Sequence, residues 1–533
     1  EIWEKRISRV RDQLTDLLFS QHFSFDLFQE IVTRVLVENG LPTDRRSIDF
    51  NPELAPQELV FEYAWSILRL PPEEQKQYYH NFEESLVVLI RTLISDHLPY
   101  INIAKRWFTI QDLFDIRQRK IGTGRIGGKA AGMLLAHRIL ENELDDELKP
   151  LLSKPEYYFI GSNEQYSFIS MNHLERWNDQ KYKTEEQMRE DYPKIVDDFL
   201  KGDFPNDILD KLEVVLQQIG TTPLIVRSSS LLEDSFGTSF AGKYDSFFLA
   251  NQGTPEENLH ALTQAIARVW ASTLNPNALL YRRKKGLQDY DERMAILIMK
   301  VEGERVGKYY LPDAAGVAFS RNLYRWTPQI RREDGFVRLV WGLGTRAVDR
   351  VGNDYPRLIA LSHPLLRPMP DFQTIERCSQ KFVDLIDMEE NTFSTLPIQD
   401  VINSDYLPLK YIVQLSEEGY FVPLQSRLME KDRKRIVITF DEMLHKTNFA
   451  LNMRKILQKL EKNYHAPIDM EFTLHLEEAD NGHPTIQYTI LQCRPQSHLS
   501  DSPEARLPTN LANKDILFST YFMVPQGLVT NIT

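Results

Sequence analysis

The character of the sequence changes near residue 119, and this change limits the folds that the chain can adopt. Before residue 119, apolar residues recur at helical spacing with charged residues between them: Leu14, Leu17, Leu18, Phe28, Ile31, Val32, Val35 and Leu36. After it, glycines cluster between Gly122 and Gly132, and short β-rich runs alternate with helical ones. We therefore predict an all-helical N-terminal domain over residues 1–118, followed by an α/β fold.

The length of 533 residues exceeds what one hydrophobic core supports, because domains average roughly 150 residues. We expect three or four structural units. A polar stretch with two prolines, Asp501–Lys514, predicts a linker, so residues 501–533 are expected to be a linker and the start of a truncated C-terminal segment. The candidate strands are Tyr157–Ile160, Leu224–Val226, Ala295–Met299, Gly316–Phe319 and Val337–Trp341.

Charge and composition exclude several classes of protein. The 63 Lys and Arg residues against 76 Asp and Glu residues give a formal charge of −13, so there is no bulk attraction to nucleic acid or anionic membranes. The longest apolar run, Leu86–Ile94, is broken by Arg91 and is far shorter than the roughly 20 residues of a membrane helix. Cys378 and Cys493 are too few for a disulfide framework, which fits a reducing compartment. We expect a cytoplasmic protein.

The stretch TTPLIVRSSSLLEDSFGTSFAGKYDSFFL, residues 221–249, carries the first candidate site. The apolar run is expected to end as a strand that delivers Arg227 into a loop, where its planar fork suits phosphate or carboxylate. The serines that follow add short donors, and Gly242 lets backbone N–H groups approach an anion. Glu233 and Asp234 are candidates to orient the arginine or to lie near a divalent cation. The structural alternative is a buried Arg227–Glu233 pair that holds a turn.

A second candidate is RIGGKAAGM, residues 125–133. A glycine pair precedes Lys129, and Ala130 and Ala131 open a helix, which places a lysine in the first helical turn, a good position for phosphate oxygens. The stretch is not the common P-loop, because Thr123 stands where the first glycine should be and Ala130 replaces Ser or Thr. The alternative is a close-packed turn between a strand and a helix.

A third candidate is DMEFTLHLEEADNGHPTIQYTILQCRPQ, residues 469–496. Its Asn-Gly pair is a strong signal for a two-residue hairpin turn. A hairpin symmetric about that pair sets Glu471 opposite Gln492 and Asp469 opposite Arg494, and parity places the amide and the guanidinium on one face. Carboxylate and amide oxygens suit Mg²⁺ shared with phosphates. A cross-strand ion pair on a solvated face is the alternative, and Pro484 leaves the register open by one or two residues.

These three stretches together resemble the N-terminal ATP-binding domain of the phosphoenolpyruvate synthase and pyruvate phosphate dikinase family. The match also includes MAILIM, AAGVAFSRN and VWGLGTRAV, and it covers roughly residues 119–497. The resemblance implies a two-lobed, ATP-grasp-like nucleotide-binding fold, with a first lobe over residues 119–290 and a second over residues 291–500. It also implies ATP and Mg²⁺ as ligands.

The resemblance assigns roles to individual positions. Lys129, behind Gly128, and Arg227 would contact the ATP phosphates, and Arg494 would bind them from the other side; these three would be the catalytic residues. Glu471 and Gln492 would hold Mg²⁺. The loop Ser239–Lys243, with Ala241 and Gly242, would fold over the phosphates. Arg282 matches an arginine at a helix end, and Met299 stands where the family has a glutamine beside the adenine.

Two departures from the family pattern leave the activity open. Only 39 residues follow Arg494, and none shows the glycine- and threonine-rich phosphohistidine motif that usually comes next. We therefore expect an ATP-dependent phosphotransferase, or the ATP-binding component of one, whose acceptor is a missing part, a partner or a small molecule. The alternative is a nucleotide-sensing protein that retains the pocket without turnover. A carboxylate–amine ligase is the third reading.

Overall fold

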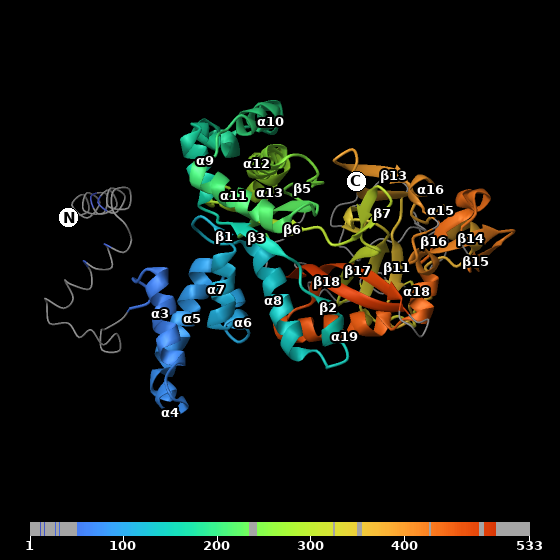
Figure 1. The fold of residues 1–533 in the computed structure, drawn as a ribbon, viewed down its shortest axis with the longest axis horizontal. Coiled ribbons are helices and arrows are strands. Elements are labelled where there is room, and N and C mark those ends of the chain that lie inside the picture. The colour runs from blue at the N-terminus through green and yellow to red at the C-terminus, as the bar shows by residue number, and fades with distance from the viewer. Residues whose placement is uncertain are drawn as a thin grey trace, which may run out of the picture. The chain divides into compact units, whose positions relative to one another are not determined.

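The computed structural model describes residues 51–233, 242–322, 326–348, 354–403, 405–425, 428–478 and 484–496, together with Arg11, Thr15, Leu27 and Ile31. The chain divides between Leu89 and Ile90 into two compact units. Figure 1 labels the elements within each unit. The candidate site lies wholly within the second unit.

The helical prediction for the N-terminal part is confirmed where that part is described. Between residues 51 and 118 the regular elements are helices: α3 (Gln57–Leu68), α4 (Pro72–Gln75), α5 (Tyr79–Leu93), α6 (Leu98–Ala104) and α7 (Ile110–Gln118). Most of the periodic residues between Leu14 and Leu36 lie outside the described residues, as does 501–533. In the part of the chain that the structure describes, no helix is long and apolar enough to cross a membrane.

A five-stranded mixed sheet begins the α/β part, and we call it the first sheet. Its strands, in spatial order, are β1 (Lys120–Ile121), β3 (Tyr157–Ile160), β6 (Met294–Lys300), β4 (Leu224–Ser230) and β5 (Ser246–Leu249). Phe168, Phe199 and Trp270 are fully buried in the core that joins this sheet to its helices. Those helices are α9 (Glu164–Met171), α10 (Glu185–Leu200), α11 (Asn206–Ile219), α12 (Pro255–Ala271) and α13 (Pro276–Lys284).

Strand β4 is longer than predicted, and the expectation that it ends at Arg227 is wrong. It continues to Ser230, and Arg227 lies in mid-strand, paired with Leu297 of β6 and Ser246 of β5. Ser228, Ser229 and Ser230 are fully buried, yet their polar groups have hydrogen-bond partners, which removes the cost of burying them. The arginine side chain therefore projects from a rigid strand and not from a loop.

A six-stranded mixed sheet follows, and we call it the second sheet. Its order is β11 (Arg357–Ala360), β10 (Phe336–Val340), β9 (Ala314–Phe319), β17 (Ile468–Glu478), β18 (Pro484–Pro495) and β2 (Leu152–Ser153). Two smaller antiparallel sheets accompany it: β13 (Thr392–Pro397), β12 (Phe382–Asp387), β8 (Tyr309–Leu311) and β7 (Glu304–Val306), then β15 (Tyr420–Pro423), β14 (Val413–Glu417) and β16 (Ile436–Ile438). The remaining helices are α14 (Thr345–Val348), α15 (Phe372–Arg377), α16 (Ile398–Val401), α17 (Leu409–Ile412), α18 (Asp441–Lys446) and α19 (Phe449–Tyr464).

Helix α8 (Gly128–Glu143) packs against both large sheets and sets their spacing. Gly127 precedes it with φ 81°, and a Cβ there would lie 1.6 Å from the carbonyl oxygen of Ser229 on β4. One and a half turns later, a Cβ at Gly132 would lie 2.1 Å from the carbonyl oxygen of Cys493 on β18. The helix approaches both strands this closely because neither glycine has a side chain.

The predicted α/β class is confirmed by these mixed sheets. The boundaries at residues 118, 290 and 500 stay predictions. Strand β6 lies after residue 290 but belongs to the first sheet, and β2 lies early in the chain but belongs to the second sheet. The two sheets therefore exchange strands across the boundary that we expected between the lobes.

Candidate functional site

A cavity of 390 Å³ is lined by residues from both large sheets. Arg227 of β4 and Met299 of β6 come from the first sheet, and Glu471 of β17 comes from the second. The other predicted residues that line the cavity are Lys129, Gly242, Gln492 and Arg494. Residues separated by more than 350 positions in the chain thus share one cavity.

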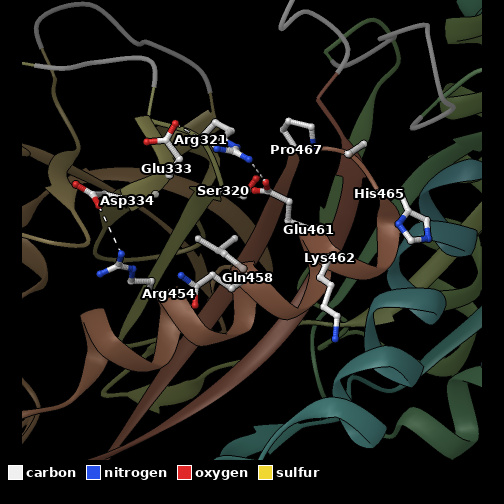
Figure 2. Close-up of a pocket in the computed structure, with 13 residues that line it drawn as sticks. Ser320, Arg321, Glu333, Asp334, Arg454, Gln458, Glu461, Lys462, His465 and Pro467 are labelled. Carbon is white, nitrogen blue, oxygen red and sulfur yellow. Dashed lines mark hydrogen bonds and ion pairs between the residues drawn. The ribbon is translucent and has the colours of Figure 1, made fainter. Parts of the chain in front are cut away.

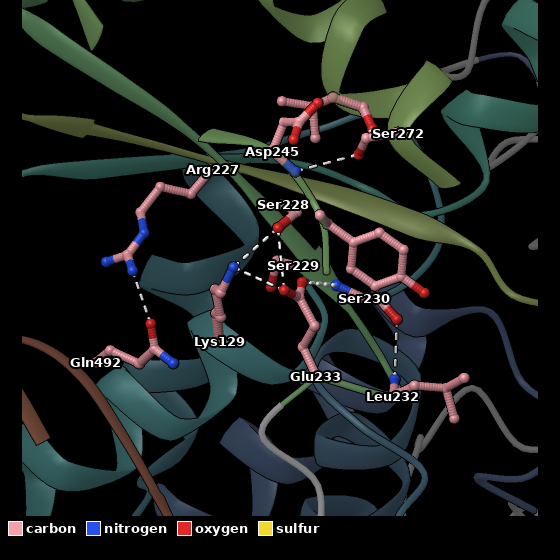
Figure 3. Close-up of polar contacts among 12 residues, drawn as sticks. Lys129, Arg227, Ser228, Ser229, Ser230, Leu232, Glu233, Asp245, Ser272 and Gln492 are labelled. Atoms are coloured by element: carbon pink, nitrogen blue, oxygen red, sulfur yellow. Dashed lines mark hydrogen bonds and ion pairs between the residues drawn. The ribbon is translucent and has the colours of Figure 1, made fainter. Parts of the chain in front are cut away.

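The Lys129 side chain is held by groups of β4 and of the turn after it (Figure 3). Its Nζ lies 2.7 Å from Glu233 Oε1 and donates a hydrogen bond of 2.8 Å to Ser228 Oγ. Glu233 also accepts hydrogen bonds from Ser228 Oγ at 3.1 Å and from the backbone N–H of Ser230 at 3.0 Å. The side chains of Lys129 and Glu233 are only 9% and 1% exposed. Glu233 therefore neutralises the lysine. The structural alternative, a buried Arg227–Glu233 pair, is wrong, because Arg227 pairs with Glu471.

The Arg227 guanidinium reaches from the first sheet to the second. Its Nη2 donates to Glu471 Oε2 at 2.6 Å and to Gln492 Oε1 at 2.7 Å. Both bonds are short, as charge-assisted hydrogen bonds are. The two residues predicted as metal ligands thus direct their oxygens at one atom.

The charge of Glu471 is stabilised by this arrangement. Burial raises the pKa of its carboxyl, but the Arg227 guanidinium, with the charges of Arg494 and Lys129, outweighs that effect and holds the pKa below its usual range. Glu471 is therefore an anion at neutral pH, as a ligand for a cation must be.

The predicted hairpin register is confirmed at the site. Asp469 pairs with Arg494, and Glu471 pairs with Gln492. Arg494 binds Asp469 through two bonds, from Nε to Oδ1 at 2.7 Å and from Nη2 to Oδ2 at 2.9 Å. Beyond Glu471 the register shifts by one residue, which leaves Leu491 as an extra residue in β18. Bulges of this kind commonly lie next to functional sites, where they redirect a side chain.

The turn that motivated the hairpin prediction, Asn481-Gly482, lies outside the described residues. So do Asp234, Ser239 and Ala241. Their predicted roles stay predictions.

Three other predicted residues lie near the cavity without lining it. A Cβ at Gly128 would lie 1.7 Å from the carbonyl oxygen of Glu233, so close packing explains this glycine. The Nζ of Lys243 lies 5.3 Å from the centre of the Tyr281 ring, a cation–π contact. Arg282 is buried and pairs with Glu292 at 3.1 Å.

Glu292 connects Arg282 to the cavity wall. It accepts hydrogen bonds from Ser230 Oγ and from the hydroxyl of Tyr244, which lines the cavity. Burial and the charge of Glu292 raise the pKa of Tyr244 well above its usual value, so the phenol stays a donor. Arg282 is therefore placed to support the wall rather than to touch a ligand in this conformation.

Sequence reasoning missed the cavity-lining residues that follow strand β10. Leu343, Gly344 and Thr345 line the cavity from the turn between β10 and α14. The segment VWGLGTRAV contributed to the family resemblance, yet no residue in it was assigned a role. Its signal was the pair Gly342 and Gly344 directly after a strand, both of which adopt positive φ.

A second cavity of 500 Å³ contains none of the predicted residues (Figure 2). Two pairs of its charged groups bind each other: Arg321 Nη2 lies 2.5 Å from Glu461 Oε1, and Arg454 Nη2 lies 3.5 Å from Asp334 Oδ1. The cavity therefore offers less uncompensated polar surface to a ligand than its volume suggests.

The first cavity can accept a polyanion. Of the cations that line it, Lys129, Arg227 and Arg494 converge from three elements, and each has a carboxylate partner. Since these pairs cancel in net charge, an added anion such as a triphosphate would be bound best together with a divalent cation.

Comparison with known proteins agrees with this chemistry. A family model described as "Pyruvate phosphate dikinase, AMP/ATP-binding domain" matches residues 123–515. The chain is similar to rifampicin phosphotransferase of Streptomyces sviceus, at 32% identity over 117 residues, which are 22% of this chain and 12% of that protein. It is also similar to the uncharacterized phosphotransferase YvkC of Bacillus subtilis, at 26% identity over 144 residues, 27% of this chain and 16% of that one. The matches thus cover less than a fifth of either relative.

Proposed function

Because the chain belongs to the pyruvate phosphate dikinase AMP/ATP-binding domain family, as its motifs predicted, we propose that it is an ATP-dependent phosphotransferase or the ATP-binding component of one. Mg-ATP binds in the 390 Å³ cavity between the two large sheets. A phosphoryl group then passes to an acceptor that these residues do not identify. With both cysteines free thiols, we place the reaction in the cytoplasm.

The convergence of Arg227, Glu471 and Gln492 on one point carries this proposal. Their polar atoms come from two different sheets and meet within 2.7 Å of a single guanidinium nitrogen. A buried arginine whose Nε atom finds no acceptor in the part of the chain that the structure describes retains capacity for a further anion. A purely structural ion pair between sheets does not need the amide as a second ligand.

The residues present fit a magnesium ion. The Glu471 carboxylate and the Gln492 amide oxygen are hard oxygen ligands that already point at a common position, where they now hold a cationic group. When bound, the ion neutralises phosphate charge. Binding of Mg-ATP therefore requires that Arg227 exchange part of its contact with Glu471 for a phosphate.

Each cation has a distinct role in this proposal. Lys129 holds phosphate oxygens from the first turn of α8. Arg227 binds the group to be transferred from β4, and Arg494 binds it from β18. Together they position the phosphates and stabilise the charge that shifts between oxygens during transfer, which is the main protein contribution to phosphoryl transfer.

The test is to incubate the chain with ATP and Mg²⁺, with and without cell extract, and to identify the nucleotide product. AMP with phosphate supports dikinase-like chemistry, whereas ADP points to a ligase or an ordinary kinase. Binding of Mg-ATP with no product under either condition supports the nucleotide-sensing alternative. No binding at all contradicts the proposal.

A variant tests the residue that links the two sheets. We expect Arg227→Ala to abolish the Mg-ATP-dependent rise in melting temperature, measured against the ligand-free variant, because the phosphates lose their central cation. A ligand at one hundred times its Kd stabilises a protein by about 2.7 kcal/mol, so the loss is measurable. Arg189→Ala on the exposed face of α10 is the control and should keep the full shift. A wild-type shift in Arg227→Ala would show that Arg227 is structural.

A further inference from the structure

Three side chains of metal-ligand type meet outside the nucleotide cavity. Glu304 lies on β7, Asp313 directly precedes β9, and His475 lies on β17, four residues beyond Glu471. One ligand atom of each lies within 4.8 Å of the others. His475 Nδ1 lies 3.0 Å from Asp313 Oδ2. Residues from three separate strands or strand ends thus share one small volume.

Asp313 is held in place as a fixed member of this group. Its side chain is fully buried. Oδ1 accepts a hydrogen bond from the Tyr406 hydroxyl, and Oδ2 accepts one from the backbone N–H of Leu476 at 2.6 Å. Supporting bonds of this kind orient metal-binding carboxylates in proteins.

The charges in the group are not balanced. Among the described residues no side chain donates a hydrogen bond to Glu304, and its carboxylate faces the buried Asp313. Glu477 adds a further carboxylate oxygen 4.0 Å from His475 Nε2. A single imidazole does not compensate three carboxylates, whereas a divalent cation does.

The group is open to solvent on one side. A cavity of 410 Å³ is lined by Glu304, His475 and Tyr406, with Arg305 and Asn403 at other positions of its wall. An ion can therefore enter, and water can occupy the coordination positions that the protein leaves vacant.

We propose that Glu304, Asp313 and His475 bind one divalent transition-metal ion of the zinc class. The combination of imidazole and carboxylate ligands suits Zn²⁺ and its neighbours, whereas Mg²⁺ prefers oxygen ligands alone. A tetrahedral ion with bonds of about 2 Å holds its ligand atoms roughly 3.3 Å apart. The ligand atoms now lie within 4.8 Å of one another, and a rotation of the half-buried Glu304 side chain would bring its carboxylate to the shorter distance.

The metal would connect two parts of the chain that flank the nucleotide cavity. Strand β7 follows β6 after three residues, and Glu302 in that connection lines the cavity. Strand β17 carries Glu471. The ion would connect β7 to β17 and would thereby stabilise the part of the cavity lining that contains Glu302 and Glu471. This inference does not depend on the proposed phosphotransfer.

The experiment measures Zn²⁺ affinity of the metal-stripped chain by competition with a chromophoric chelator. We expect one Zn²⁺ per chain and a rise in melting temperature on binding. Glu304→Gln and His475→Gln, whose side chains are partly exposed, should each weaken binding by about 100-fold or more, because each removes a direct ligand. His260→Gln, at an exposed position of α12, is the matched control and should bind as the wild type does.

Cobalt tests the coordination of the bound ion, and magnesium tests the selectivity of the site. Co²⁺ bound to the wild type should show the visible absorption typical of a low coordination number. Both ligand variants should lack this absorption. Millimolar Mg²⁺ should not displace Zn²⁺, which separates this site from the one predicted at Glu471. The proposal is overturned if the wild type binds no Zn²⁺, or if both ligand variants keep wild-type affinity.

Discussion

The two walls of the cavity proposed to bind the nucleotide are built by different means. The first wall comes from β4 with the start of α8, and the second from the hairpin of β17 and β18. On the first wall, Lys129 and Glu233 are brought together by backbone packing, because Gly127 and Gly128 let α8 touch β4 and the turn after it. On the second wall, Asp469 and Arg494 are brought together by the pairing of adjacent strands in one hairpin. The first wall is deeply buried, and the second retains partial exposure.

The two walls therefore differ in whether their contacts can be predicted from the sequence. Strand pairing is a local rule, so the partners on the second wall follow from the hairpin sequence. Helix packing joins distant parts of the chain, so the partner of Lys129 depends on a fold that local rules do not give. We also expect substitutions in the first wall to lower the free energy of unfolding more than substitutions in the second.

The largest effect is expected at Gly127. The change Gly127→Ala places a methyl group 1.6 Å from the carbonyl oxygen of Ser229 and imposes a positive φ on alanine, so the helix must move away from β4. We expect a loss of roughly 3 kcal/mol or more in the free energy of unfolding, measured by urea denaturation.

Gly220→Ala provides the matched control for Gly127→Ala. Gly220 also has positive φ, at 69°, but its Cβ would meet nothing within 4 Å. We expect it to lose only the backbone strain of a residue held at φ 69° and ψ −135°, about 1–3 kcal/mol, and less than Gly127→Ala, which adds the steric clash. Equal losses in the two variants would show that φ alone, and not the approach of α8 to β4, explains Gly127.

The next effect is expected at Glu233. The change Glu233→Gln leaves the buried Lys129 ammonium without its counter-charge, and breaking such a pair costs about 3 kcal/mol in the free energy of unfolding. The control is Asp207→Asn, which breaks the exposed Lys211–Asp207 pair and should cost less than about 0.5 kcal/mol. The contrast between the variants is read from urea melts, and a loss below about 1 kcal/mol at Glu233 would argue against a tightly buried first wall.

The smallest effect is expected in the pH dependence of the second wall. The folded pKa of Glu471 lies below the unfolded value, so its contribution to stability is present above pH 4.5 and is lost as pH falls through the folded pKa. Unfolding free energies of wild type and Glu471→Gln, measured between pH 6 and pH 3, should therefore converge as the pH falls. Parallel curves would mean that Arg227 does not stabilise the carboxylate.

Most of the strand positions in the site follow from the sequence. Tyr157–Ile160 is β3 as predicted, and Glu471 lies opposite Gln492 as predicted. These follow because apolar runs and an Asn-Gly pair act over a few residues. The bulge at Leu491 preserves the predicted pairs at the site although the register shifts beyond it.

The partners across the cavity could not be predicted in the same way. Arg227 and Glu233 are close in the sequence, which suggested that they pair. The buried serines extend β4 past Arg227, however, and the two side chains bind different partners. Arg227 pairs with Glu471, and Glu233 pairs with Lys129. Arg282 at the end of α13 is a similar case, since its partner Glu292 lies in the segment after that helix. Such contacts depend on how the sheets meet, which no local pattern encodes.

In the proposed function, both walls of the cavity bind the same nucleotide. The most direct test follows amide hydrogen exchange on addition of Mg-ATP in two segments, residues 128–131 at the start of α8 and residues 491–494 on β18. If one nucleotide contacts both walls, exchange slows in both segments over the same range of Mg-ATP concentration. Slowing in one segment alone, or in neither, would contradict it.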